Sequence, residues 1–529
     1  MSLQFITGNS GNGKTKYLFN RIVKEAKANP RDNYLVIVPE QFTMQTQRQL
    51  VDLSENKAIM NIDVLSFKRL AYRVFDELGI TNLTVLEETG KNLVLRKLAA
   101  QEADKLGVIG RNLNRIGYIS EVKSLLSELV QYNISPEELG RYIASGRLSD
   151  TLSDKLKDVL VLYEAFEKFM QDKYITAEEI LNVLSNVAEE SAILRNSVIA
   201  FDEFTGFTPI QNQLIKKLFV ISKKIYVTLT IDCREDIFKS RGMQELFDMP
   251  KRTVKSLTEM AAFYGIEVEE PIILDKNYRL AENEELSFME QQLFRKRRCS
   301  FKKVPKHIHI DCLRDPKQEL TKIARRINEL VRNENLRYRD IAIVTGDVNI
   351  YAGYVREIFD KYNIPYFIDA TQEILFHPFI EFIRSIPDIA AQNFSADAVF
   401  RFLRCGFSEL LDSEIDVLEN YVLACGVRGK SAWDKKWVRL PKHKAGYDLE
   451  LLNQSREYIM ELLKPVYQVF SDKKSTVKDY VLAIYKLIVL LDIPDKLAKK
   501  EQALLDAGDQ TASKEYGQIY KIVMQLFEK

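Results

Sequence analysis

The stretch that decides the fold reads Gly8-Asn9-Ser10-Gly11-Asn12-Gly13-Lys14-Thr15. It fits the pattern G-x-x-x-x-G-K-[ST] at every fixed position. Residues 3–7 before it are typical of a short buried strand, and residues 15–28 after it are typical of a helix. A strand, a glycine-rich loop and a helix in this order place backbone N–H groups and the positive helix end around a phosphate. The sequence therefore predicts a nucleotide-binding site formed by these eight residues.

Two side chains of this loop are suited to particular tasks. Lys14 is predicted to neutralise the β- and γ-phosphates of ATP, and the hydroxyl of Thr15 to bind Mg²⁺. The alternative is an ordinary glycine-rich turn in which the lysine occurs by chance. The flanking strand and helix favour the nucleotide site.

Composition bounds the class of protein. A chain of 529 residues is expected to form on the order of three or four domains. A hydrophobic content of 46% and a charged content of 29% are typical of soluble globular proteins. The net charge is +1, so contact with nucleic acid must come from local basic patches. The five cysteines contain no CxxC or CxxxC pair, which argues against a disulfide framework and a zinc site and suits the reducing cytoplasm. We expect neither a signal peptide nor a membrane span.

A downstream acidic motif completes the predicted site. Residues 197–203 read Ser-Val-Ile-Ala-Phe-Asp-Glu, an apolar strand that ends in two acids. Because ligands gather at the carboxyl ends of parallel strands, Asp202 is predicted to lie beside the loop and hold Mg²⁺. Glu203 is predicted to polarise the attacking water as general base. Alone, such a strand end is equally typical of a solvated surface, but its pairing with the loop favours the catalytic interpretation.

Several segments resemble superfamily 1 helicases of the UvrD/RecB type. Residues 202–211 resemble the D-E-x-Q-D-x-x-P-x-Q motif of that family. Residues 34–45 resemble its second motif, and residues 62–70 its T-F-H-S-L segment, both of which contact single-stranded DNA. Residues 274–279 read Leu-Asp-Lys-Asn-Tyr-Arg and resemble the L-x-x-N-Y-R motif. The resemblance implies an α/β fold of two RecA-like P-loop NTPase domains with helical insertions, and it makes Arg279 a group that reaches the γ-phosphate. An inter-domain salt bridge is the alternative role for Arg279.

A narrower resemblance covers the first 80 residues most specifically. Residues 38–45 read Val-Pro-Glu-Gln-Phe-Thr-Met-Gln and, with the glycine loop and residues 62–73, are similar to the B-subunit family of the bacterial AddAB helicase–nucleases. This resemblance implies ATP-dependent processing of double-strand DNA ends for recombinational repair. It also implies a heterodimer with AddA, which is the main motor, and recognition of the Chi sequence. A nuclease domain with an iron–sulfur cluster is expected beyond residue 529, so that this chain is an N-terminal portion.

Two departures from the helicase pattern concern the nucleotide itself. The adenine-reading glutamine motif has no room before the loop, and the Gly-Asp-x-x-Gln motif reads Thr-Ile-Asp-Cys-Arg-Glu over residues 230–235. The glutamine that senses the γ-phosphate is therefore absent. We expect ATP to act mainly as a structural or regulatory ligand in a helicase-shaped scaffold. An active ATP-driven single-strand DNA translocase is the alternative, and a small-molecule P-loop kinase is a weaker one.

The DNA contacts predicted from the resemblance lie in two strand-to-helix loops. They are Gln41, Phe42, Thr43, Ser66, Phe67 and Arg69. The two phenylalanines are suited to stacking on bases, but burial in a core is the alternative for each. The threonine, the serine and the arginine are suited to the phosphate backbone. A basic cluster over residues 295–306 either binds phosphates or forms a solvated linker.

The expected domain map alternates sheet and helical regions. Residues 1–85 and 197–280 are predicted to form the first RecA-like domain with the nucleotide site, and residues 86–196 a helical insertion. Residues 281–376 are predicted to form an incomplete second RecA-like domain, and residues 377–529 its helical insertion. Within this map the apolar spacing predicts helices over 92–105, 120–132 and 153–173. The second domain is expected to start with a helix over 284–296, and the helicase resemblance implies a strand over 338–344.

Overall fold

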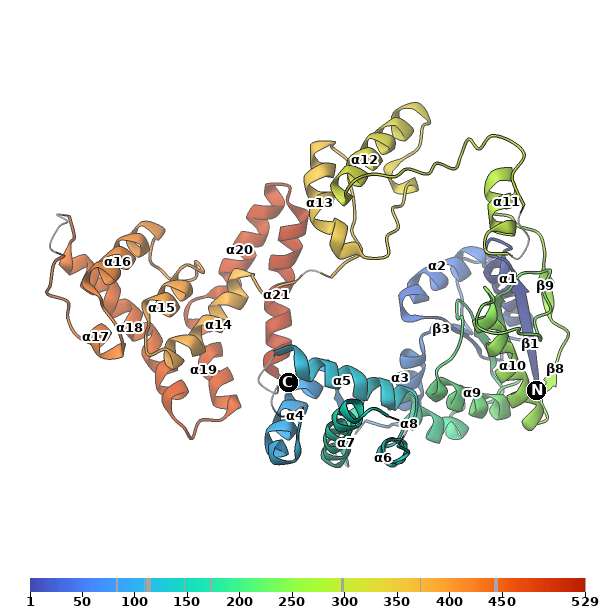
Figure 1. Cartoon of the computed structure of the whole chain (residues 1–529), viewed down its shortest axis with the longest axis horizontal. Coiled ribbons are helices and arrows are strands. Elements are labelled where there is room, and N and C mark those ends of the chain that lie inside the picture. Colours follow the sequence, from blue (N-terminus) through green and yellow to red (C-terminus); the bar gives the residue numbers. More distant parts are fainter. Residues whose placement is uncertain are drawn as a thin grey trace. The chain divides into compact units, whose positions relative to one another are not determined.

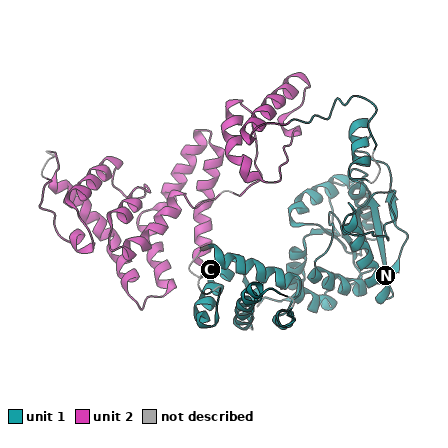
Figure 2. Cartoon of the chain, viewed as in Figure 1, with its two compact units in different colours: residues 1–311 teal, residues 312–529 magenta. Residues whose placement is uncertain are grey.

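The computed structural model describes residues 1–81, 84–108, 110, 116–146, 148–171, 174–295, 299–371, 373–441 and 446–528. The chain divides into two compact units, residues 1–311 and residues 312–529 (Figure 2). Helix α11, Glu284–Gln292, lies within the predicted helical stretch 284–296 and belongs to the first unit.

Unit 1 is built on a parallel sheet (Figure 1). Its strands are β1 Ser2–Gly8, β2 Tyr34–Ile37, β3 Ile62–Leu65, β6 Val198–Phe201, β7 Lys224–Thr230, β8 Glu267–Val268 and β9 Ile272–Leu274. Their order is β3-β2-β6-β7-β1-β8, and β9 also pairs with β1. The register aligns Gly8 at the end of β1 with Thr230 on β7, and Phe201 at the end of β6 with Val227 on β7. The ends of β1 and β6 therefore lie at the same edge of the sheet, one strand apart.

Helices cover both faces of this sheet. Leu3 and Phe5 of β1 pack on one side, while Ile6 packs on the other, as the two-residue period of a strand requires. The helices that belong to the sheet are α1 Lys14–Ala28, α2 Thr43–Leu53, α3 Phe67–Leu78, α8 Ile180–Val187, α9 Pro209–Ile221 and α10 Asp248–Phe263. Short 3₁₀ turns η1 Glu40–Phe42 and η4 Ala188–Glu190 precede α2 and follow α8. The predicted strand, loop and helix at the start of the chain are confirmed.

A helical region separates the third strand of the sheet from β6 in the sequence. It contains α4 Glu88–Gln101, η2 Ala103–Lys105, α5 Ile116–Gln131, α6 Pro136–Ala144 and α7 Asp150–Met170. Strands β4 Val85–Leu86 and β5 Ile175–Thr176 pair in parallel at its two ends. The helices surround their own apolar core, which includes Leu95, Leu126 and Leu162. The expected helices between residues 92 and 171 are thus confirmed, apart from stretches outside the described residues.

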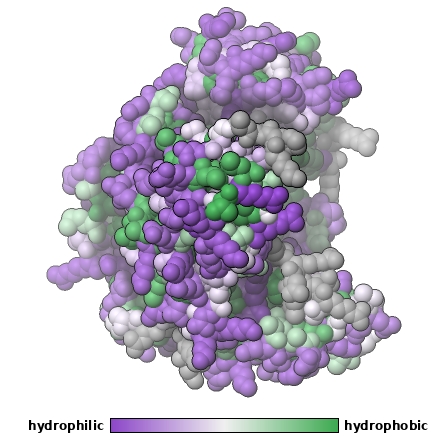
Figure 3. Space-filling view, turned by 90° about the vertical axis from the view of Figure 1, so that its left-hand side faces the viewer, coloured by the Kyte–Doolittle hydropathy of each residue, from purple (hydrophilic) through white to green (hydrophobic). Residues whose placement is uncertain are grey.

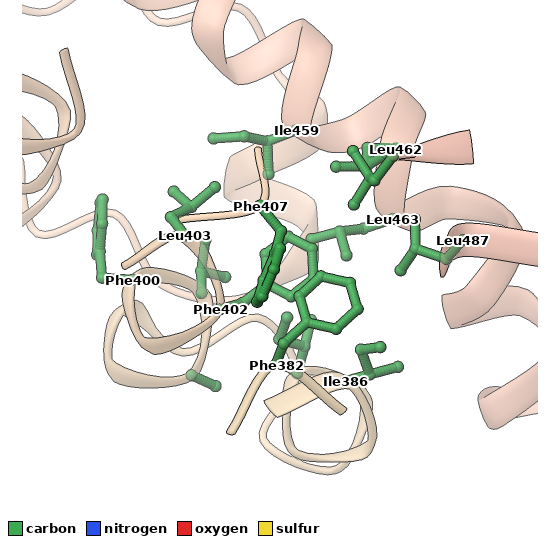
Figure 4. Close-up of a cluster of buried hydrophobic side chains, with 14 of the residues drawn as sticks. Phe382, Ile386, Phe400, Phe402, Leu403, Phe407, Ile459, Leu462, Leu463 and Leu487 are labelled. Carbon is green, nitrogen blue, oxygen red and sulfur yellow. The ribbon is translucent and has the colours of Figure 1, made fainter. Parts of the chain in front are cut away.

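Unit 2 is helical throughout its described residues. Its elements are α12 Pro316–Asn333, η5 Tyr338–Asp340, α13 Val348–Lys361, α14 Pro378–Ala391, α15 Ala396–Leu403, α16 Asp412–Cys425, α17 Lys430–Asp434, α18 Leu449–Ser471, α19 Val477–Leu490, α20 Ile493–Asp506 and α21 Gln510–Glu528. A large apolar core joins α14 to α21, and within it the ring of Phe382 contacts the rings of both Phe402 and Phe407 (Figure 4). A space-filling view of one side of the molecule shows a mainly hydrophilic surface with a hydrophobic patch near the centre (Figure 3).

The strand predicted over residues 338–344 is wrong. The 3₁₀ turn η5 occupies its start, and no strand occurs among the described residues of unit 2. Ile343 and Val344 leave 45% and 92% of their surface exposed, so this apolar stretch is not covered by a sheet. A parallel strand is stable only when neighbouring strands satisfy its backbone groups. The α/β architecture therefore holds for unit 1, and the described residues of unit 2 do not confirm the second RecA-like sheet. No helix among the described residues is both long and apolar enough to span a membrane.

A buried ion cluster in the helical region leads to the first prediction. Lys91 is 3% exposed, and its Nζ lies 2.6 Å from Oε2 of Glu178 and 3.0 Å from Oε1 of Glu88. Lys91→Ala should lower the free energy of unfolding by about 3 kcal/mol, because it leaves the carboxylate of Glu178, which is only 11% exposed, without its lysine partner. Denaturant unfolding measures the change. Lys157→Ala, which breaks an exposed pair with Asp154, is the control and should barely move the midpoint; equal effects would contradict the prediction.

Candidate nucleotide-binding site

The phosphate loop runs from the end of β1 to the start of α1. Gly11 and Gly13 have φ angles of +87° and +79°, in the left-handed region that glycine adopts without strain. A Cβ atom on Gly11 would lie 2.7 Å from Oδ1 of Asn277 and 2.8 Å from Cβ of Arg279. The glycine at this position is therefore required both by the backbone conformation and by the close approach of a second segment.

Lys14 is held inside the loop. Its Nζ donates to the carbonyl oxygens of Gly8 at 3.1 Å and of Asn9 at 3.0 Å. Burial lowers the pKa of Lys14, and the charges of Glu203 and Asp202 oppose that change. The ammonium thus lies at the loop with two carboxylates near enough to act on it, which is the position expected of a phosphate-neutralising lysine.

The two predicted acids lie across from the loop at the end of β6. The hydroxyl of Thr15 lies 3.3 Å from Oδ1 of Asp202 and 3.3 Å from Oε1 of Glu203. Asp202 is 1% exposed and also accepts a hydrogen bond from the Thr228 hydroxyl. Glu203 is exposed and has a φ angle of +65°, which is uncommon for a residue with a side chain. Such strain is concentrated at functional sites, where the surrounding structure holds it in place.

The carboxylate of Asp202 has the character of a cation ligand. Its Oδ2 is buried and has no hydrogen-bond partner among the described residues. Burial raises the pKa of Asp202, and the nearby Glu203 charge adds to the rise, while the Thr228 hydroxyl opposes it. An unpartnered, buried carboxylate oxygen beside a threonine hydroxyl suits Mg²⁺, which prefers hard oxygen ligands. The residues present therefore fit the metal that the sequence predicted.

A second segment closes over the loop. Asn277 donates from Nδ2 to the carbonyl oxygen of Ser10 at 2.9 Å, and the N–H of Tyr278 donates to the carbonyl oxygen of Gly11 at 3.0 Å. Arg279 donates from a guanidinium nitrogen to the Ser10 hydroxyl at 3.4 Å. Within the described part of the chain this guanidinium contacts a loop hydroxyl rather than a carboxylate. The structure thus places Arg279 beside the phosphate loop, within unit 1 itself.

Tyr278 is a site residue that the sequence reasoning missed. Its ring lines the cavity and would lie 3.5 Å from a Cβ atom on Gly13, while 66% of the residue stays exposed. The L-x-x-N-Y-R resemblance contained the signal, but only its arginine was singled out. An exposed ring beside a phosphate loop is available for contact with a nucleotide.

These groups line one cavity of about 770 Å³. Its walls include Lys14, Thr15, Asp202, Glu203 and Arg279, and it extends to Gln49 and Asp52 of α2. This volume is in the range of small-ligand and cofactor sites. All four residues predicted to be catalytic are therefore brought together.

The predicted DNA contacts fall into exposed and buried groups. Gln41 and Arg69 are exposed, whereas Thr43 and Ser66 are 5% and 4% exposed. The Thr43 hydroxyl donates to the carbonyl of Glu40, and the Ser66 hydroxyl accepts the N–H of Arg69 as the cap of α3. Both hydroxyls therefore serve local structure.

The two phenylalanines of these loops also have structural contacts. Phe67 is 7% exposed, stacks with Phe201 and meets Phe204 edge-on, so it has the buried role that was the alternative to base stacking. Phe42 is half-buried against the core beneath α1 and α2. A smaller cavity of about 320 Å³ lies between these loops, lined by Pro39, Lys68 and Gln211 among others.

The family model and the similar proteins point to the same family. The family described as "ADDB, N-terminal" matches residues 5–290. The chain is 38% identical to the B subunit of an ATP-dependent helicase/deoxyribonuclease from Lachnoclostridium phytofermentans, over all of this chain and 47% of that protein. It is 31% identical to proteins with the same description from Clostridium novyi and Clostridium acetobutylicum, over all of this chain and 46% of each. The chain spans about half the length of the curated relatives it matches. With more than half of its residues matched by this family, and with an intact phosphate loop at its start, the chain belongs to the AddB N-terminal family.

Proposed function

We propose that this chain is the ATP-binding, helicase-like portion of the B subunit of an ATP-dependent helicase/deoxyribonuclease. The complex would process double-strand DNA breaks for recombinational repair in the cytoplasm. The observation that carries the proposal is the convergence of Lys14, Thr15 and Asp202 on one cavity, with a buried carboxylate oxygen left for a cation. The description of the relatives, as one subunit of an ATP-dependent enzyme, supports the same assignment.

Each residue of the site has a task in this proposal. The loop N–H groups and Lys14 bind the phosphates. Thr15 and Asp202 would hold Mg²⁺, which would supply positive charge to the phosphates when bound. Glu203, exposed at the cavity wall, orients a water molecule toward the γ-phosphate. Arg279 stabilises charge on the same phosphate, and Tyr278 lies where a base or ribose can contact it.

Residues 230–235, where the helicase pattern has a glutamine and this chain does not, support a regulatory rather than a motor role. Asp232 is 1% exposed and lies in ion pairs with Arg234 at 2.6 Å and Arg295 at 3.0 Å. Burial alone would raise the pKa of Asp232, but hydrogen bonds and charge from the arginines outweigh it and lower the pKa to about 2. This segment is therefore fixed in an ion cluster. We infer that ATP is bound as a structural or regulatory ligand while AddA, the proposed partner, moves the complex along DNA.

DNA ends, single-stranded DNA and Chi are the proposed substrates of the complex. Gln41 and Arg69 are the exposed members of the predicted DNA-binding set and are suited to backbone contact. The nuclease domain with its iron–sulfur cluster is proposed to lie in the part of the full-length protein that follows these residues.

Replacement of Lys14 tests the nucleotide site. We would compare the wild-type chain with Lys14→Ala in the full-length complex. In both samples the phosphate-loop lysine of AddA is replaced, so that AddA does not hydrolyse ATP. We expect wild type to retain labelled ATP with only background hydrolysis, and Lys14→Ala to bind ATP at least about tenfold more weakly, because a charge-assisted phosphate contact is lost. Lys24→Ala, on an exposed position of α1, is the control. Equal retention of ATP by wild type and Lys14→Ala would refute the nucleotide site. Hydrolysis of ATP that needs both DNA and Lys14 would support the translocase instead.

Replacement of Arg69 tests the DNA assignment. Arg69→Ala should weaken binding of single-stranded DNA across sequences and reduce the slope of log affinity against log salt by about 1, because one phosphate contact is lost. Fluorescence anisotropy over a salt series measures both quantities. The matched control is Arg141→Ala, an exposed arginine of the helical region. An unchanged slope in Arg69→Ala would remove this residue from the DNA interface.

A further inference from the structure

Asn9 of the phosphate loop is bonded to two other elements of unit 1. Its Nδ2 donates to Oε1 of Glu290 at 2.7 Å, on helix α11 Glu284–Gln292. Its Oδ1 accepts the backbone N–H of Cys233 at 3.0 Å. The residue is 5% exposed, so both polar atoms of the amide are used in the interior. Asn9 thus joins the loop to a helix that lies 281 residues away in the sequence.

The same residue is also bonded to the phosphate-binding lysine. The carbonyl oxygen of Asn9 accepts from Nζ of Lys14 at 3.0 Å and from the N–H of Asn12 at 3.2 Å. A displacement of Lys14 toward phosphates acts directly on the Asn9 backbone. Because the side chain is held by Glu290 and Cys233, such a displacement also acts on α11.

The opposite end of α11 holds the chain that leads out of unit 1 (Figure 1). Glu285 accepts the backbone N–H groups of Lys306 at 2.7 Å and of His307 at 2.8 Å. The rings of Phe288 and Phe301 lie 5.3 Å apart. Helix α11 therefore bridges the phosphate loop and residues 301–307, a few residues before unit 1 ends at Asp311.

The remaining contacts at the loop-side end of α11 are of a different kind. Arg295 pairs with the buried Asp232, its guanidinium lies 4.8 Å from the ring centre of Phe247, and Arg234 donates to the carbonyl oxygen of Gln291 at 3.0 Å. Opening such a buried ion cluster leaves an uncompensated charge, so it resists rearrangement. Glu290 lies at the edge of this cluster, because its Oε1 is 3.9 Å from a guanidinium nitrogen of Arg295. The hydrogen bond that the neutral amide of Asn9 donates to the same oxygen joins the cluster and α11 to the phosphate loop.

We propose that Asn9 and Glu290 are positioning residues that couple occupancy of the phosphate loop to α11 and, through Glu285, to residues 301–307. The inference rests on the proposed function, since the loop must bind a nucleotide for the coupling to operate. Through these contacts, nucleotide binding at the loop can affect α11 although the chain lacks the sensor glutamine of the helicase pattern. Coupling between two sites is reciprocal, so loss of the contact to α11 must also change nucleotide affinity.

Hydrogen–deuterium exchange tests the route in the full-length protein. The probe is ATPγS, compared with no nucleotide, and the readouts are the exchange of residues 284–292 and 301–307 and the dissociation constant of ATPγS. In wild type the nucleotide should slow exchange in both segments. Asn9→Ala and Glu290→Ala should each abolish that difference and weaken binding about fivefold, at the lower end of typical coupling factors. Both variants remove the contact between Asn9 and Glu290, and Glu290→Ala also removes the 3.9 Å pair with Arg295. The double variant should therefore bind no more weakly than Glu290→Ala alone.

Glu284→Ala is the matched control. It removes a glutamate of the same helix that pairs with Lys303 at an exposed position, and it should keep the nucleotide-dependent protection of residues 284–292. Two independent single variants keep the test decisive if one of them fails to fold. Failure of wild type to bind ATPγS would overturn the proposed function and the coupling together. Intact binding with equal protection in wild type, Asn9→Ala and Glu290→Ala would overturn the coupling alone.

Discussion

The nucleotide site depends on the parallel pairing of β7 with β1 on one side and β6 on the other. This pairing places Gly8, where the phosphate loop begins, and Phe201, after which Asp202 follows, at one edge of the sheet. It also places Thr228 of β7 between them, where its hydroxyl bonds Asp202. A slip of one residue would turn each side chain of a strand to the opposite face, so the apolar residues that alternate between the two cores also fix the geometry of the polar site.

Much of this site could be predicted because its signals are local. The strand, loop and helix at residues 3–28 and the apolar strand before Asp202 are contiguous patterns whose spacing reflects their geometry. The contacts that could not be predicted join residues far apart in the chain. The bond from Asn9 to Glu290 and the positive φ angle of Glu203 follow from the assembled fold, and no short pattern contains them.

The wrong strand and the buried phenylalanine have the same cause. Residues 338–344 have the apolar content of a strand, but strand formation is decided by neighbours that share its hydrogen bonds. Phe67 follows a strand-to-helix junction, as predicted, yet its ring is 7% exposed because Phe201 and Phe204 lie beneath it. The sequence pattern therefore located the strand-to-helix loops correctly. The role of each side chain in them depends on tertiary packing, which the pattern does not contain.

The electrostatics of the site divide its contacts into fixed and adjustable ones. Asp232 lies in the segment where the helicase pattern has its sensor, and its pKa of about 2 keeps it charged under ordinary conditions. A buried charge with two arginine partners costs several kcal/mol to expose or separate, about 3 to 5 by comparison with broken buried pairs. A segment held in this way is unsuited to move with each nucleotide. A neutral amide bonded to one carboxylate is much less costly to rearrange, since a hydrogen bond to a charged group is worth about 1.5 to 3 kcal/mol. The proposed binding and the proposed coupling thus use different groups: the lysine and the acids for the nucleotide, and the asparagine amide for the link to helix α11.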